Sequence, residues 1–159
     1  MAFHPKARST TGVDAYTREL DERLEKIVRA FIAAGIEPVY ADWKHSAPAK
    51  RVLHLKSRSG RGVDLLFTSF PFEDELIEKA IRVEHPTTGA FPLARRDDRV
   101  LLKLVARRPQ DIVDVIDLRE FGKIEDPDRI LRIVAEFAEL AEDPEMLAQA
   151  EKLLAQSRP

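Results

Sequence analysis

The chain has 159 residues, of which 44% are hydrophobic and 34% charged, and it contains no cysteine. This composition fits one globular domain and argues against a disordered or low-complexity chain, while the missing cysteines exclude disulfides, thiolate metal sites and a cysteine nucleophile. A net charge of −2 gives no bulk attraction to nucleic acid, and no apolar run approaches the roughly 20 residues that cross a bilayer, so we expect a cytoplasmic protein without a membrane segment.

The first half of the chain predicts a helix followed by strands. Apolar residues recur at helical spacing from Leu20 to Ile32, with Thr17 as the expected cap and Gly35 as the expected terminator. Three later stretches alternate β-branched or aromatic residues with polar ones and predict strands. These stretches are residues 37–43, 51–56 and 63–68. Turn formers at residues 57–62 predict that the last two strands are antiparallel neighbours.

The second half predicts mostly helices. A short helix is expected from Pro71 to Ile81, followed by a loop at residues 86–89 and an extended piece at residues 91–94. Four further helices are marked by apolar spacing or by proline at the first helical position. Their markers are Val100–Val105, Pro109, Asp126-Pro127 and Asp143-Pro144. A mixed sheet followed by helices predicts the α+β class, or a small α/β sheet with a helical appendage.

Asp64 interrupts an otherwise apolar predicted strand, and this position has two interpretations. Strand alternation would place Asp64 with Leu66 on a solvated face, which is the ordinary position of an aspartate. Alternatively, Asp64 contributes to a metal site or an acid-base site. The strand pattern leaves both interpretations open.

Two aspartates in a predicted helix form a second candidate cluster. Asp111 and Asp114 are three residues apart and share one helix face, opposite Ile112, Val113 and Ile116. Basic residues nearby could hold these aspartates in ion pairs of purely structural importance. They are Lys103, Arg107 and Arg108.

Aromatic and histidine side chains carry weaker signals. Tyr40 and Trp43 could stack a nucleobase, although packing in the core or at its rim is the commoner role of such residues. His45, His54 and His85 are scattered and lack metal-ligand spacing, so we expect surface or packing roles for them.

Three segments, taken in chain order, carry motif-like residues. They are His4, Arg8, Thr10, Val13 and Asp14; Val63 to Leu66; and Lys103, Leu104, Ala106, Arg108, Gln110, Asp111 and Asp114. The segments resemble the motifs H-G-x-x-R-x-T-x-D-[IV]-D, V-D-L-L and K-L-x-A-x-R-x-[KQ]-D-x-x-D of nucleotidyltransferases of the AbiEii-like and minimal-nucleotidyltransferase kind. The resemblance implies a small mixed β-sheet of nucleotidyltransferase type in residues 1–120, with residues 121–159 as a C-terminal helical extension of the same domain.

The resemblance also implies an activity, which is Mg²⁺-dependent transfer of a nucleotidyl group from a nucleoside triphosphate to an RNA, a protein or a small molecule. Many such enzymes are toxins encoded beside antitoxins. Asp14 and Asp64 would be the catalytic residues and would hold Mg²⁺, because oxygen ligands suit this ion. A second set would bind the nucleotide phosphates. It comprises Arg8, Thr10, Lys103 and Arg108.

The chain departs from the family pattern in three places. Gly12 stands where the first aspartate of the D-x-D motif is expected, and Pro5 replaces a glycine. The glycine-rich turn that cradles the triphosphate would precede His4, and we expect that segment to be missing. A sheet edge or apolar face would then be uncovered, so we expect a homo-oligomer or a bound partner protein.

Three functions remain open on the sequence. The first is a degenerate nucleotidyltransferase that serves as a binding or regulatory module. The second is an active nucleotidyltransferase with an altered phosphate site, which a second subunit could complete. The third is a non-enzymatic interaction protein that uses its late helices. A structure without a mixed sheet that brings Asp14 near Asp64 would favour the third function.

Overall fold

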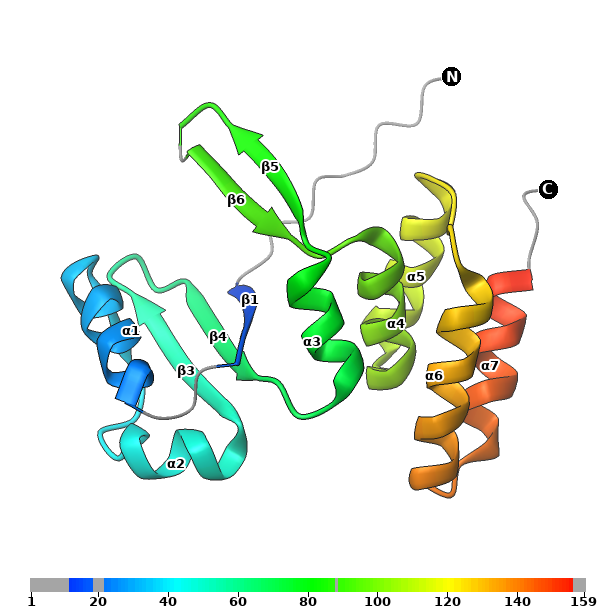
Figure 1. Cartoon of the computed structure of the whole chain (residues 1–159), viewed down its shortest axis with the longest axis horizontal. Helices are drawn as coiled ribbons and strands as arrows, with labels where there is room; N and C mark the ends of the chain where they lie inside the picture. The colour runs from blue at the N-terminus through cyan, green and yellow to red at the C-terminus, as the bar shows by residue number, and fades with distance from the viewer. Residues whose placement is uncertain (1–11, 19–21, 88, 156–159) are drawn as a thin grey trace. The chain divides into compact units, whose positions relative to one another are not determined.

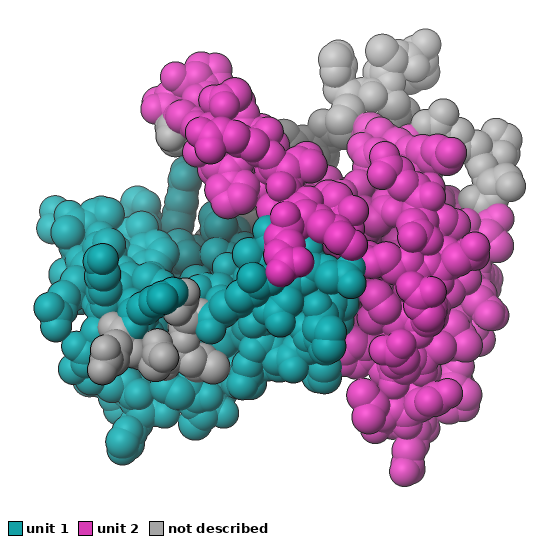
Figure 2. All heavy atoms as spheres, in the orientation of Figure 1, with its two compact units in different colours: residues 1–77 teal, residues 78–159 magenta. Residues whose placement is uncertain are grey.

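The computed structural model describes residues 12–18, 22–87 and 89–155. It has an α+β fold in which a mixed four-stranded sheet with helices is followed by a part made of four helices (Figure 1). The chain divides into two compact units, residues 1–77 and 78–159 (Figure 2). The expected extent of a nucleotidyltransferase-like domain, residues 1–120 with an extension at 121–159, stays a prediction. None of the described helices is long and apolar enough to cross a membrane.

The four-stranded sheet of the first unit has the order β1-β4-β3-β2. The strands are β1 (Gly12–Thr17), β2 (Ile36–Pro38), β3 (Val52–Ser57) and β4 (Gly62–Phe67). β1 runs parallel to β4, whereas β3 is antiparallel to both of its neighbours. The predicted antiparallel pairing of the strands at residues 51–56 and 63–68 is confirmed.

Two helices cover one face of this sheet. They are α1 (Glu22–Ala33) and α2 (Trp43–Lys50). Alternate residues of β3 and β4 point toward them, which is the arrangement expected when one face of a sheet is buried. The resulting core consists of Leu24, Val28, Ala47, Leu53, Leu55, Leu65 and Phe67.

Two predictions for this unit are wrong in detail. Thr17 is the last residue of β1 and does not cap α1, which begins at Glu22. The predicted strand at residues 37–43 is strand only as far as Pro38; the chain then turns and begins α2 at Trp43. The sequence did not predict α2, because Pro48 lies in its interior and an interior proline normally disfavours a helix.

The segment after the sheet forms α3 (Pro71–Glu78) and then a two-stranded hairpin. The hairpin consists of β5 (Ile81–His85) and β6 (Gly89–Leu93), in the second unit. The predicted extension of the helix to Ile81 is therefore wrong, because Ile81 begins β5 and pairs with Leu93. The β-branched residues Ile81 and Val83 favour a strand over a continued helix.

The helical part consists of α4 (Arg96–Ala106), α5 (Pro109–Glu120), α6 (Pro127–Leu140) and α7 (Pro144–Ala155). α6 packs against α4 and α7, and α4 packs against α5. The proline start signals are confirmed, and the Asp126 carboxylate accepts a hydrogen bond from the Arg129 backbone N–H at 2.9 Å as an N-cap. The fully buried side chains of this part include Val100, Leu101, Val115, Ile130 and Val134.

Candidate functional site

Asp14 on β1 and Asp64 on β4 are register partners in neighbouring parallel strands. Register partners in a parallel pair point to the same face of the sheet, and neighbouring strands lie about 4.8 Å apart. The structure therefore brings together the two residues that the motifs single out as catalytic carboxylates. Their roles as catalytic residues and Mg²⁺ ligands stay predictions.

The face that carries these carboxylates is the one opposite α1 and α2. In β4, Leu65 and Phe67 are buried in the core beneath the helices, so alternation places Asp64 on the other face. Asp14 is exposed, and the Asp64 side chain is 44% exposed. The structure thus confirms that Asp64 lies on a solvated face of the sheet. Asp14 lies beside Asp64 on the same face, so the interpretation as a metal or acid-base site stays a prediction.

His54 on β3 extends this row on the other side of Asp64. His54 is the antiparallel register partner of Asp64, and its Nδ1 lies 2.7 Å from Asp64 Oδ1. Because an ionised carboxylate can only accept, the Nδ1–H of His54 donates this hydrogen bond. The Tyr40 ring meets the His54 ring edge-on, with centroids 6.0 Å apart. We name Asp14, Asp64 and His54 the polar row.

The sequence analysis did not identify His54 as a site residue, although the predicted hairpin could have placed it beside Asp64. Turn formers at residues 57–62 predict a hairpin, and a hairpin centred on Ser59 places His54 opposite Asp64. The scattered spacing of the histidines along the chain concealed this cross-strand proximity.

Tyr16 lies two residues beyond Asp14 on β1 and so shares the face of the polar row. Burial raises the pKa of Tyr16 to about 12, and the negative charges of Glu73 and Asp14 add to this effect. The Tyr16 hydroxyl therefore stays protonated at neutral pH and can act as a hydrogen-bond donor on this face.

The polar row would supply two carboxylates to a metal ion, if one binds here. Mg²⁺ prefers an octahedral shell of oxygen atoms and commonly keeps several waters or substrate phosphate oxygens in it. Asp14 and Asp64 fit that donor chemistry as a partial shell. Within residues 12–18, 22–87 and 89–155, no group of three or more acidic or histidine side chains has metal-binding geometry. Arg8 and Thr10 lie outside the described residues.

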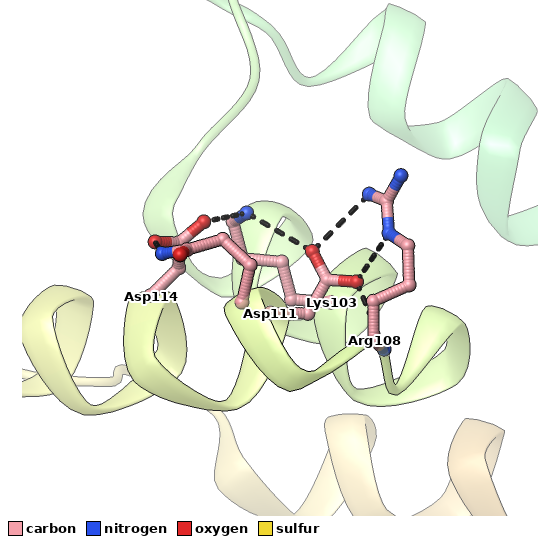
Figure 3. A network of polar contacts seen from close by, with 5 residues as sticks. Lys103, Arg108, Asp111 and Asp114 are labelled. Atoms are coloured by element: carbon pink, nitrogen blue, oxygen red, sulfur yellow. Dashed lines mark hydrogen bonds and ion pairs between the residues drawn. The ribbon is translucent and has the colours of Figure 1, made fainter. Parts of the chain in front are cut away.

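The third motif folds into a network of ion pairs in the second unit (Figure 3). The Lys103 ammonium on α4 donates to Asp114 Oδ2 at 2.5 Å and lies 3.4 Å from Asp111 Oδ1. Arg108 donates from its Nε to Asp111 Oδ2 at 2.6 Å, and from its backbone N–H to the same oxygen at 3.1 Å. Gln110 donates to Asp114 Oδ1 at 2.8 Å. The five polar positions of the motif thus bind one another.

Asp111 is the centre of this network, with only 2% of its side chain exposed. Burial acts to raise the pKa of Asp111, but hydrogen bonds from the side chain and backbone of Arg108 and the charges of Arg108 and Lys103 outweigh it, so the pKa is lowered. The helix face expected for Asp111 needs correction, because Asp111 shares the buried side of α5 with Val115 while Val113 is 40% exposed. Asp111 is buried because its carboxylate accepts the Arg108 N–H at the start of α5.

Lys103 and Arg108, expected to bind phosphates, therefore already have acidic partners within their own unit. Arg107, the third basic residue considered for pairing, instead pairs with Asp143 and donates to Gln149 at 3.0 Å. Asp14 and Asp64 belong to the first unit and Lys103 to the second, so a lysine that faces the carboxylates stays a prediction.

Comparison with protein-family models finds no match to this chain, and comparison with curated proteins finds none either. The likeness to nucleotidyltransferases consequently rests on the sequence motifs alone and stays an expectation.

Proposed function

We propose that this chain is a nucleotidyltransferase-like protein with impaired transfer activity that serves in binding a nucleotide, its phosphates or a partner protein. The observation that carries the proposal is the register pairing of Asp14 with Asp64 on the open face of a mixed sheet. Two motifs far apart in the sequence supply these residues, and a chance likeness would not require them to be neighbours. The sheet type fits the proposed family.

The proposed impairment rests on the composition of the polar row. Gly12, at the position of the missing aspartate, pairs with Gly62, so the neighbouring register position carries no carboxylate on either strand. A magnesium ion here would be held by Asp14 and Asp64, with water or phosphate oxygens completing its shell. When bound, the ion would neutralise phosphate charge and lower the pKa of an attacking hydroxyl.

Internal pairing of the basic residues also supports impairment. The Lys103 side chain is 26% exposed, and its ammonium is shared by two carboxylates, which offset the positive charge that a triphosphate would need. Recruiting Lys103 to a phosphate would leave Asp111 buried with one fewer cation, and leaving a buried charge without its partner is costly.

An active Mg²⁺-dependent nucleotidyltransferase of the toxin-antitoxin type, acting on RNA, protein or a small molecule, is the second candidate. It is favoured by the fact that Asp14, Asp64 and Lys103 are all present. A non-enzymatic interaction protein is the third candidate. Exposed apolar side chains favour a partner or a second copy in each case, among them Val13 at 61% and Leu140 at 74% exposure.

Two measurements on the purified chain test the proposal. Incubation with radiolabelled nucleoside triphosphates and Mg²⁺ should give little or no transfer, and robust transfer that disappears in Asp64→Ala would instead establish the active enzyme. Mg²⁺-dependent binding of a nucleoside triphosphate, followed by calorimetry, should be lost in Asp14→Asn and Asp64→Asn. The control is Asp128→Asn, an exposed aspartate at the start of α6. Binding that is absent from the wild type, or unchanged in both site variants, would overturn the proposal.

A further inference from the structure

A shallow hollow of about 250 Å³ lies in the first unit, at the edge of the sheet formed by β2. Its lining residues are Ile32, Glu37, Pro38, Tyr40, Ala41 and Trp43. Pockets for drug-sized ligands start at roughly 300 Å³, so this hollow suits one planar ring system rather than a complete cofactor. The lining is largely apolar and aromatic, with one carboxylate.

The aromatic lining is accessible. Tyr40 is 52% exposed and Ile32 is 46% exposed, which is unusual for large side chains that lie close together. Trp43 is half-buried and packs against the core of the unit. A cation accompanies each ring: Lys50 Nζ lies 5.8 Å from the Tyr40 centroid, and Lys44 Nζ lies 5.8 Å from the Trp43 centroid. Exposed aromatic rings with adjacent cations are the recurring elements of sites that stack single nucleic-acid bases.

We propose that this hollow binds a nucleobase with an exocyclic amino group, stacked against Tyr40 and hydrogen-bonded to Glu37. Adenine, cytosine and guanine carry such an amino group and uracil does not. A carboxylate can only accept hydrogen bonds, so Glu37 favours the amino-bearing bases and disfavours the carbonyl of uracil at the same position. Lys56 is the register partner of Glu37, and among the described residues no ion pair joins the two.

The hollow is connected to the polar row through Tyr40, which lines the hollow and also contacts the His54 ring. His54 in turn donates to Asp64. Tyr40 therefore links the hollow to the row that contains Asp64, whereas Asp14 lies on β1, at the opposite edge of the sheet from β2. The inference rests on the proposed function for its biological meaning, but binding of the base itself needs neither metal nor transfer.

Trp43 provides the test, because it is the only tryptophan of the chain. Its fluorescence is titrated with adenosine, cytidine and uridine in the absence of Mg²⁺. We expect a saturable change with adenosine and cytidine and a much weaker one with uridine. Tyr40→Ala should weaken adenosine binding about 5- to 150-fold, the loss that follows from removing one base–aromatic stack. Glu37→Gln should narrow the preference for adenosine over uridine.

The matched control is Phe91→Ala on β6, an aromatic residue that is 39% exposed and does not line the hollow. It should leave the titration unchanged. Circular dichroism establishes that each variant is folded. Trp43 fluorescence that does not change with any of the three nucleosides would overturn the inference. So would emission that changes with protein concentration alone, since a second copy would then cover the hollow.

The two proposals can fail separately. If adenosine does not bind while Mg²⁺-dependent triphosphate binding requires Asp14 and Asp64, only the base site is overturned. If adenosine binds through Tyr40 but no Mg²⁺-dependent binding of a triphosphate is found, the base site is supported and the proposed nucleotidyltransferase-like function is overturned.

Discussion

His54 donates a hydrogen bond from its Nδ1 to Asp64 across two antiparallel strands, at a distance of 2.7 Å. Both side chains are partly exposed, at 39% and 44%, so neither is held by burial. The hydrogen bond itself fixes the direction in which the Asp64 carboxylate points. Through this contact His54 acts as a positioning residue for the site.

The first prediction concerns this contact. His54→Ala should weaken Mg²⁺-dependent nucleotide binding by about 2- to 10-fold, which corresponds to the loss of one ordinary hydrogen bond. His54→Asn keeps a side-chain donor and should restore part of the affinity. Calorimetry with and without Mg²⁺ checks this, because a purely structural role of His54 would alter both titrations equally. Equal affinities of the wild type and His54→Ala would refute the positioning role.

The second prediction concerns the buried carboxylate of Asp111. Its pKa is lowered in the folded chain from the ordinary value of 3.8, since the contacts with Arg108 and Lys103 outweigh burial. A depressed folded-state pKa contributes stability above pH 4 that is lost as the pH falls through the folded value. Asp111→Asn should destabilise the chain by about 1–3 kcal/mol at neutral pH and should flatten the loss of stability below about pH 4.

Urea unfolding of the wild type and Asp111→Asn between pH 2.5 and 7 measures both effects. Asp143→Asn is a useful control, because Asp143 pairs with Arg107 outside the Lys103 network. Parallel stability curves for the wild type and Asp111→Asn across this range would contradict the prediction.

Local signals allowed much of the fold to be predicted from the sequence. Proline at the first helical position marked α5, α6 and α7, and turn formers marked the β3–β4 hairpin, because both depend on residues close together in the chain. Helix α2 was missed because Pro48 disfavours a helix, and β5 was missed because only two residues separate it from the short helix α3.

The candidate site was predicted less evenly. Pairing of Asp14 with Asp64 is a long-range parallel contact that no local pattern specifies, and only the resemblance to a family suggested it. The burial of Asp111 could not be inferred from apolar spacing, because a hydrogen-bonded carboxylate replaces an apolar side chain on the buried side of α5. Tyr40 is accessible because β2 ends at Pro38, before Tyr40. The alternating pattern instead predicted a strand that continued to residue 43.

The third prediction concerns Tyr16. Its pKa is raised to about 12 by burial and by the nearby charges of Glu73 and Asp14, against an ordinary value of 10.0. The unfolded chain therefore releases this proton at a lower pH than the folded chain, so the stability that Tyr16 contributes is complete below pH 10 and is lost as the pH rises toward 12. Tyr16→Phe should remove this alkaline loss. Ultraviolet titration of the wild type and Tyr16→Phe should show that Tyr16 ionises well above the ordinary value of 10.0, and a Tyr16 transition at that ordinary value would disprove the prediction.

The fourth prediction concerns the carboxylate that the polar row lacks. Gly12→Asp places an acidic side chain two residues before Asp14, on the same face of β1. A third carboxylate should strengthen Mg²⁺-dependent nucleotide binding by at least about tenfold. Even residues that contact a metal ion only through its ligands typically contribute that much to metal affinity. A Cβ at Gly12 would lie 3.2 Å from the Gly62 carbonyl oxygen, so the strands must separate slightly. Gly12→Ala carries the same crowding without the charge and is the matched control. If both variants lose affinity alike, the strand contact rather than the missing aspartate limits this site.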